Sequence, residues 1–107
     1  MADQIPRQLL AELERELKQI YGDQLCGVYL FGSYARGEQD PESDLDILIV
    51  LRDYESYSAE IKRTGRVISR LSLECGISIS RKFIRQSDWK MGDSPLVRNI
   101  REEAIPT

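Results

Sequence analysis

Two short apolar segments constrain the fold of this 107-residue chain more than any other feature. The first is Leu25–Phe31 (LCGVYLF) and the second is Leu45–Leu51 (LDILIVL), and each has the length and composition of a buried strand. The second is especially rich in branched residues, which favour strands. A polar stretch with glycines, residues 32–43, separates the two. We therefore expect two buried strands joined by a polar connection.

Helical periodicity precedes the first of these segments and follows the second. A first helix is predicted from apolar residues that recur at steps of three or four, namely Ile5, Leu9, Leu13, Leu17 and Ile20. Pro6 suits the first turn of this helix, and Gly22 suits its end. A second helix is predicted from about Ser56 to Cys75, and Gly76 ends it.

A third strand and a last helix complete the pattern. The strand is predicted from Ile77 to about Ile84, and Ser94-Pro95 predicts the start of the helix, because a capping residue precedes a proline. The apolar side of this helix is formed by Leu96, Val97, Ile100 and Ala104. The order of elements predicts an α/β fold, a small mixed β-sheet flanked by helices, in a single domain over residues 1–107.

The composition excludes several kinds of site. The chain has no histidine, which excludes zinc sites that use imidazole and nucleophiles that depend on a histidine. Cys26 and Cys75 lie among apolar residues without CxxC spacing, so we expect both to be reduced and buried.

Location and partners are also limited by the sequence. No apolar run approaches the ~20 residues of a membrane span, and Met1–Pro6 is unlike a signal peptide. We therefore expect a cytoplasmic protein with no membrane association. The net charge is −3, with acidic residues concentrated in the first half and basic residues in the second. We interpret this asymmetry as solvated helix faces, and no direct DNA binding is expected.

The stretch between the two apolar segments contains the residues most suited to chemistry. Gly32 allows the backbone to approach a ligand closely, and the start of a short helix after it would offer N–H groups to an anion, with the Ser33 hydroxyl beside them. In Ser43-Asp44-Leu45-Asp46 the two aspartates are two residues apart, so in a strand they point to one face. Such a pair suits Mg²⁺ that phosphates also bind. An isolated SDxD more often only begins a strand or caps a turn.

The combination of these two elements resembles the signature of minimal nucleotidyltransferases, small relatives in the polymerase β superfamily. Ten residues separate Ser33 from Asp44, and Tyr34-Ala35-Arg36-Gly37 continues the Gly-Ser turn as in that family. The closing segments Ser94-Pro95-Leu96 and Asn99–Glu102 resemble the family more weakly.

The resemblance implies a role for each residue of the motif. ATP would be the substrate, with the nucleotide bound by Gly32, Ser33, Arg36 and Ser43. Asp44 and Asp46 would be both the Mg²⁺ ligands and the catalytic residues. Arg36 is equally suited to pair with phosphate or to form a surface ion pair with Glu38 or Asp40.

One position departs from the family pattern. Full members of the superfamily have a third carboxylate on the next strand, where this chain has Ser78 and Ser80. The metal that activates the acceptor hydroxyl would lack an anionic ligand, so nucleotide binding is predicted more directly than turnover. Catalysis would be slow, would use a carboxylate from a partner, or would be absent.

The resemblance further implies an antitoxin that transfers AMP from ATP to a hydroxyl, that of a tyrosine, on a HEPN-family ribonuclease toxin in a hetero-oligomer. A chain of this length leaves little room for an acceptor-binding lobe, which disfavours a small-molecule acceptor. The alternative is a catalytically degenerate module with this fold that neutralises its toxin by masking it, and the serines on the third strand favour that alternative.

Overall fold

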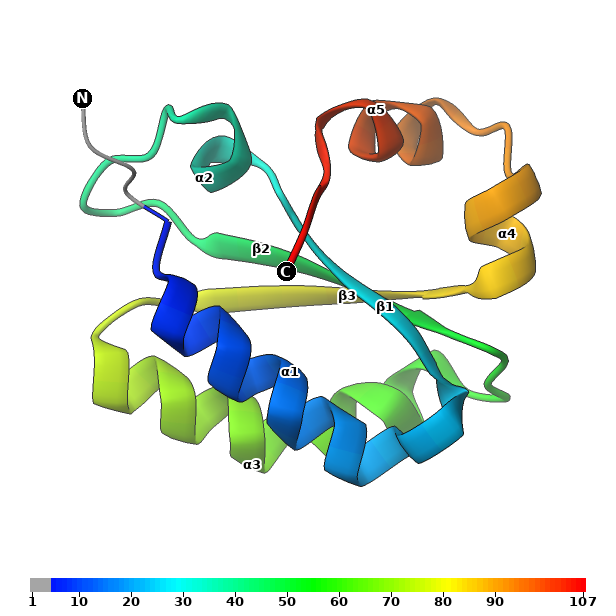
Figure 1. Cartoon of the computed structure of the whole chain (residues 1–107), viewed down its shortest axis with the longest axis horizontal. Helices are drawn as coiled ribbons and strands as arrows, with labels where there is room; N and C mark the ends of the chain where they lie inside the picture. The colour runs from blue at the N-terminus through cyan, green and yellow to red at the C-terminus, as the bar shows by residue number, and fades with distance from the viewer. Residues whose placement is uncertain (1–4) are drawn as a thin grey trace.

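The computed structural model describes residues 5–107 (Figure 1). In chain order its elements are α1 (Arg7–Tyr21), the 3-10 helix η1 (Gly22–Gln24), β1 (Leu25–Phe31), α2 (Ser33–Arg36), β2 (Leu45–Leu51), α3 (Tyr57–Cys75), β3 (Ile79–Arg85), α4 (Gln86–Met91), α5 (Pro95–Glu103) and β4 (Ile105–Pro106). The two strands predicted from the apolar segments have the predicted bounds. The sequence predicts that residues 1–6 are not part of a signal peptide. Residues 1–4 of this segment lie outside the described residues.

The four strands form one sheet in the order β3-β2-β1-β4. The prediction of a mixed sheet is confirmed. β1 runs antiparallel to both β2 and β4, whereas β2 and β3 are parallel. A parallel pair needs a long crossover connection, and α3 supplies it. The register places Phe31 of β1 opposite Asp46 of β2, and Ser80 of β3 beside Asp46 on the other side.

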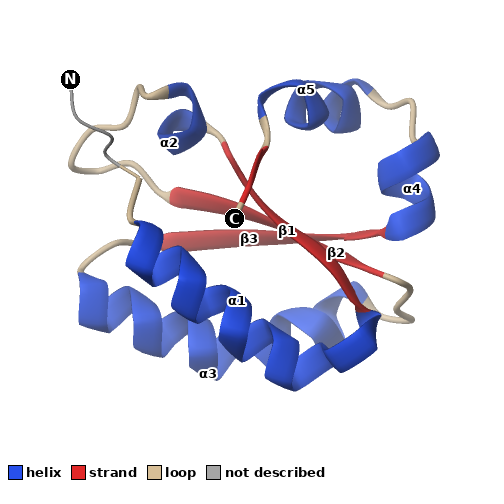
Figure 2. Cartoon of the chain, in the orientation of Figure 1, coloured by secondary structure: helices blue, strands red, loops and turns tan. Residues whose placement is uncertain are grey.

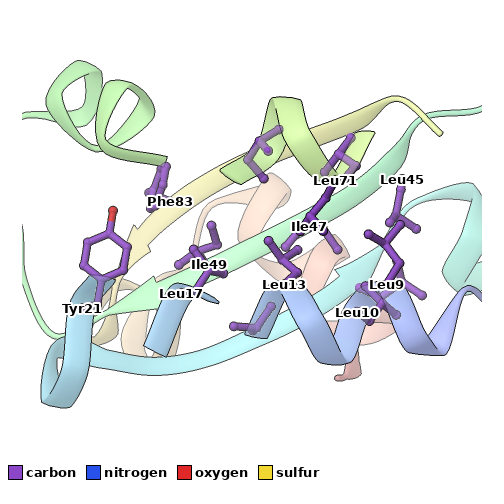
Figure 3. Packing of buried hydrophobic residues seen from close by; sticks show 14 of the residues in the cluster. Leu9, Leu10, Leu13, Leu17, Tyr21, Leu45, Ile47, Ile49, Leu71 and Phe83 are labelled. Carbon is purple, nitrogen blue, oxygen red and sulfur yellow. The ribbon is translucent and has the colours of Figure 1, made fainter. Parts of the chain in front are cut away.

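Helices cover both faces of the sheet (Figure 2). α1 and α3 pack on one face and bury the larger cluster of apolar side chains, which includes Leu13, Leu17, Ile47, Ile49 and Leu71 (Figure 3). On the other face, Phe31, Leu48, Val50 and Ile100 form a smaller cluster under α5. β2 is therefore buried on both faces, and its alternation turns Asp46 toward the face of α5.

The predicted cap at Ser94 is confirmed, because Ser94 accepts a hydrogen bond from the Val97 N–H at the start of α5. Ser56, the predicted approximate start of the second helix, is the cap of α3 and accepts a hydrogen bond from the Ala59 N–H. Gly76 ends α3 in the left-handed conformation (φ 67°). The side chains of Ser56 and Ser94 thus accept from N–H groups of the first helical turn that have no partner within the helix.

The third strand begins at Ile79 rather than at Ile77. The N–H groups of Gly76 and Ile77 both donate to the Ser72 carbonyl, so the residues after α3 complete the end of that helix before the strand can start. Ser78 precedes the strand, and its carbonyl accepts a hydrogen bond from the Leu45 N–H. α4 and the short β4 are elements that the apolar periodicity did not predict.

The predicted burial of both cysteines is wrong, because Cys26 and Cys75 are exposed. Cys26 lies at an irregularity of β1, where the pairing with β2 shifts between Leu25 and Gly27, so this residue has no partner in the register. Cys75 is the last residue of α3.

Leu96, assigned to the apolar side of the last helix, is 57% exposed in the first turn of α5, although Ile100 on the same helix is buried. Within residues 5–107, no helix is both long enough and apolar enough to cross a membrane.

Candidate functional site

The site is organised around the contact between Gly32 and Asp46. Gly32 lies between β1 and α2 with φ 78° and ψ −157°, a conformation that residues with a side chain rarely adopt. A Cβ atom at this position would lie 2.1 Å from Oδ2 of Asp46. The glycine is therefore required twice, once for its backbone angles and once for the close approach of the carboxylate.

Asp46 is a half-buried carboxylate on the second residue of β2. Burial raises the pKa of Asp46 above its ordinary value, and the negative charge of Asp44 raises this pKa further. The positive charges of Lys82 and Arg36 act in the opposite direction, and Glu103 adds a small upward contribution. Asp46 thus carries a negative charge at an electrostatic cost, which a bound cation would relieve.

Asp44 directly precedes β2 and is exposed to solvent. Its charge acts on Asp46, and the buried Leu45 separates the two aspartates in sequence. The two carboxylates are therefore electrostatic neighbours with different surroundings, Asp44 in solvent and Asp46 against the backbone of Gly32.

A cleft of about 510 Å³ opens on the α5 face of the sheet, within the size range of small-molecule sites. Figure 1 shows α2 and α5 on this face, near the end of β1. The cleft is lined by Phe31, Gly32, Ser33, Arg36, Asp46, Leu96, Asn99, Ile100 and Glu103. Four of the predicted site residues thus line one cavity. α2 has only four residues, so its dipole contributes little, and any anion affinity must come from individual N–H, hydroxyl and guanidinium groups.

Arg36 forms ion pairs with two carboxylates at the rim of the cleft. Its Nε donates to Oε1 of Glu38 over 2.8 Å, which is one of the two surface pairs that the sequence suggested. A second guanidinium nitrogen lies 3.2 Å from Oε1 and Oε2 of Glu103 on α5. Glu103 also accepts a hydrogen bond from the Gly32 N–H at 2.6 Å. Arg36 is thus at the cleft and charge-compensated there.

Ser43 contributes to a turn of the connection rather than to the lining of the cleft. Its Oγ accepts a hydrogen bond from the Asp40 N–H at 2.9 Å, and its own N–H donates to the Asp40 carbonyl at 3.0 Å. This turn precedes Asp44 directly. The structure therefore gives Ser43 a place in positioning the first aspartate, away from the four predicted residues that line the cavity.

Ser80 occupies the position beside Asp46 on the neighbouring strand. In β3, Ile79 and Phe83 point toward the α1/α3 face, so the alternation turns Ser80 and Lys82 toward the face that holds the cleft. Lys82 lines an adjoining groove of about 200 Å³ and attracts the charge of Asp46. Of the two serines named as candidates for the position of the third carboxylate, Ser80 is thus the one beside Asp46.

The donor set fits a magnesium ion held jointly with phosphates. Two neighbouring carboxylates, one of them with a raised pKa caused partly by the other, suit a hard divalent cation that keeps most of its ligands as water or phosphate oxygens. Among residues 5–107, no three acidic or cysteine side chains are grouped so as to hold a metal by themselves. Any ion here would therefore need further oxygen ligands from water or from its substrate.

Glu103 is the residue of the cleft that sequence reasoning missed. The signal was present, because Glu103 follows Ile100 by three residues and Asn99 by four, and residues at these spacings share a helix face. Ile100 was assigned to the buried side of this helix. A carboxylate one turn later on the same side is directed toward the sheet, and here it reaches Gly32.

Comparison with known proteins agrees with this geometry. Residues 10–106 match the Nucleotidyltransferase domain family. A protein of Methanocaldococcus jannaschii named "Putative protein adenylyltransferase" is 38% identical over 73 residues, which cover 68% of this chain and 73% of the relative.

Two solved structures share the fold. A chain of a toxin–antitoxin complex crystallised with AMP-PNP has a TM-score of 0.66 at 19% identity, covering 95% of this chain and 72% of that chain. A chain described as a "putative minimal nucleotidyltransferase" has a TM-score of 0.56 at 23% identity, covering 99% of this chain and 100% of that chain. On the length of the family match and the shared fold, this chain belongs to the nucleotidyltransferase domain family.

Proposed function

We propose that this chain is a metal-dependent protein adenylyltransferase of the antitoxin type, which transfers AMP from ATP to a tyrosine hydroxyl of a HEPN-family ribonuclease toxin. The observation that carries the proposal is the carboxylate of Asp46 packed against the backbone of Gly32, in a cleft that also contains Ser33 and Arg36. Family membership, the name of the M. jannaschii relative and the toxin–antitoxin structure with AMP-PNP support it.

Each of the residues predicted from the sequence motif has a role in this proposal, although Ser43 and Asp44 do not line the cleft. The Gly32 N–H and the Ser33 hydroxyl bind oxygens of the β- and γ-phosphates, and Arg36 pairs with their charge. Mg²⁺ bound by Asp44 and Asp46 supplies charge neutralisation of the triphosphate. Ser43 keeps Asp44 in place through the turn that begins at Asp40.

The chemical step is an in-line displacement at the α-phosphorus. The acceptor oxygen forms a bond to the α-phosphorus, the bond from this phosphorus to the α–β bridging oxygen breaks, and pyrophosphate leaves. The acceptor hydroxyl must lose its proton in this step. A tyrosine hydroxyl has a pKa of about 10, so it is still protonated at neutral pH and needs a base. Ser80 is not a base, so the proton passes to water or to a basic group of the partner. We therefore expect slow transfer by this chain's own residues.

The acceptor approaches over the apolar groove beside the cleft. This groove shares Leu96 and Ile100 with the cleft, and Tyr57, Phe83 and Trp89 also line it. A partner segment with a tyrosine fits such an apolar, aromatic lining. From the groove, the tyrosine hydroxyl would extend past Leu96 and Ile100 into the cleft, toward Asp46. We place the reaction in the cytoplasm, a compartment with ATP and Mg²⁺ in which the two exposed thiols would stay reduced.

Intact-mass measurement of the toxin tests the proposal. Incubation of the cognate toxin with this chain, ATP and Mg²⁺ should add multiples of the AMP mass to the toxin. Asp46→Asn should abolish the addition, and Asp23→Asn should not, because Asp23 lies in η1 at the opposite end of β1. No mass change with the natural chain, together with unimpaired protection from the toxin by Asp44→Asn and Asp46→Asn, would defeat the proposal.

The second candidate is a module that neutralises the toxin by masking it, and Ser80 beside Asp46 is the observation that favours it. A masking protein needs neither ATP nor an intact Asp46. Toxin activity assayed with and without ATP separates the two functions, since masking protects equally in both conditions and adenylylation protects only with ATP.

A further inference from the structure

The carboxylate of Glu103 is bound by the two groups that the proposed function assigns to phosphate. The Gly32 N–H donates to Oε2 of Glu103 over 2.6 Å, and the Arg36 guanidinium lies 3.2 Å from both carboxylate oxygens. Only 25% of the Glu103 side chain is exposed. A carboxylate held by a backbone N–H and a guanidinium has the charge and the acceptor atoms of a bound phosphate group.

The contact with Gly32 excludes simultaneous binding of a phosphate to the same N–H, because Gly32 has a single backbone N–H. Two of the three guanidinium nitrogens of Arg36 are already paired with the carboxylates of Glu38 and Glu103. A phosphate oxygen that accepts from Gly32 must therefore displace Oε2 of Glu103. The negative charge of Asp46 also repels that of Glu103, which opposes movement of a displaced Glu103 carboxylate toward Asp46.

The backbone around Glu103 is fixed on both sides. Ile100, one turn earlier, is buried in the smaller cluster, and Ile105, two residues later, pairs with Leu30 of β1. The end of α5 is also closed by the bond from the Ala104 N–H to the Ile100 carbonyl. Displacement is therefore confined to the side chain of Glu103, which makes it a local competitor and not a moving lid.

We propose that Glu103 sets the nucleotide affinity of this chain by competing with the terminal phosphates of ATP for Gly32 and Arg36. The inference rests on the proposed function, because it takes the triphosphate to bind at these groups. It gives this carboxylate a role opposite to that of Asp44 and Asp46, since those two bind the nucleotide through a cation and Glu103 opposes binding.

The other role open to a carboxylate at this place is that of a third metal ligand. Both oxygens of Glu103 are engaged by hydrogen-bond donors, and within residues 5–107 no three acidic side chains are grouped so that they could hold a metal ion together. A metal ligand and a competitor have opposite effects when removed, which makes the two roles separable by experiment.

Isothermal titration of the whole chain tests the inference, with ATP, inorganic triphosphate and adenosine as probes in Mg²⁺ buffer. Glu103→Ala should lower the dissociation constants of ATP and triphosphate by about three- to tenfold, the scale of one or two charge-assisted hydrogen bonds near the surface. Glu103→Gln should give a smaller gain, because its amide oxygen still accepts from Gly32. Adenosine, which has no phosphate, should show no change.

Glu102→Ala is the matched control, because it removes the same charge from the exposed neighbouring position of α5. An equal gain with Glu102→Ala would show a general charge effect and overturn the inference. Unchanged affinities in both Glu103 variants would overturn it and leave the proposed function standing, and weaker binding would make Glu103 a ligand instead. If neither ATP nor triphosphate bound to any variant, the proposed function would fail together with the inference. Glu103→Gln keeps the side-chain shape and decides the matter if Glu103→Ala does not fold.

Discussion

Replacement of Gly32 by alanine separates the two reasons for glycine at the centre of the site. The backbone angles at Gly32 (φ 78°, ψ −157°) are strained for any residue with a Cβ, at a cost of about 1–3 kcal/mol. The new Cβ would also lie 2.1 Å from Oδ2 of Asp46, so the carboxylate must rotate away from its place against the backbone. We expect Gly32→Ala to lower the free energy of unfolding by about 2–4 kcal/mol, the strain plus the displaced packing.

Urea denaturation followed by circular dichroism measures this change, and Gly37→Ala is the matched control. Gly37 also has a positive φ (72°), but a Cβ there meets nothing within 4 Å, so only the strain of about 1–2 kcal/mol remains. In the double variant Gly32→Ala/Asp46→Ala the clashing carboxylate is absent, and the two substitutions should couple by about 1 kcal/mol or more. Equal losses for Gly32→Ala and Gly37→Ala, or additive effects in the double variant, would refute the contact between Gly32 and Asp46.

Four further predictions follow from the same geometry. Ser80→Asp places a carboxylate beside Asp46 and should raise the rate of AMP transfer about tenfold or more, measured by intact mass against Ser69→Asp on α3. Leu96→Asn removes apolar surface without adding a charge and should weaken transfer to the toxin but leave ATP affinity, by titration, within about twofold, because Leu96 lines both the cleft and the groove. Tyr21→Phe removes the buried hydrogen bond from Tyr21 Oη to Glu60 and should cost about 1–2 kcal/mol in urea denaturation. The pKa of Asp46 is raised in the folded chain, so the native state binds more protons than the unfolded state, and stability falls as pH rises through this pKa. Asp46→Asn should therefore stabilise the chain at pH 7, where the carboxylate is charged, and not at pH 3.

The course of the chain could be predicted wherever local patterns decide the structure. The strands Leu25–Phe31 and Leu45–Leu51 follow from their composition, and the helix cap at Ser94 follows from the need to satisfy unpaired N–H groups. The start of β3 at Ile79 could not be predicted from apolarity, because the hydrogen bonds that end α3 involve Gly76 and Ile77.

The site was predictable in part. The spacing of the Gly-Ser turn and the two aspartates identified Gly32, Ser33, Arg36 and Asp46, which do line one cleft, because a strand register of fixed period brings them together. Ser43 has a hydrogen-bonding partner in its own turn, which a residue pattern does not disclose. Glu103 reaches the cleft through the packing of α5 on the sheet, a contact between residues 71 positions apart in sequence.

The exposure of Cys26 depends on an irregularity in strand pairing rather than on its apolar neighbours. Likewise, α4 is a six-residue helix directly after β3, and it is too short for a periodic apolar pattern that could predict it. In each case the decisive interaction is between segments, and a single sequence holds no record of it.

The central claim is that the cleft lined by Gly32, Ser33, Arg36 and Asp46 binds ATP together with Mg²⁺. Nuclear magnetic resonance of the nitrogen-labelled chain tests this claim most directly. Titration with ATP and Mg²⁺ should shift the amide signals of Gly32, Ser33, Asp46 and Glu103 first, with the Gly32 amide changing most because its acceptor is exchanged. The same titration of Asp46→Asn should leave these signals nearly still. Shifts centred elsewhere, as around the start of α1 and β4, or no shifts at millimolar ATP, would contradict the account.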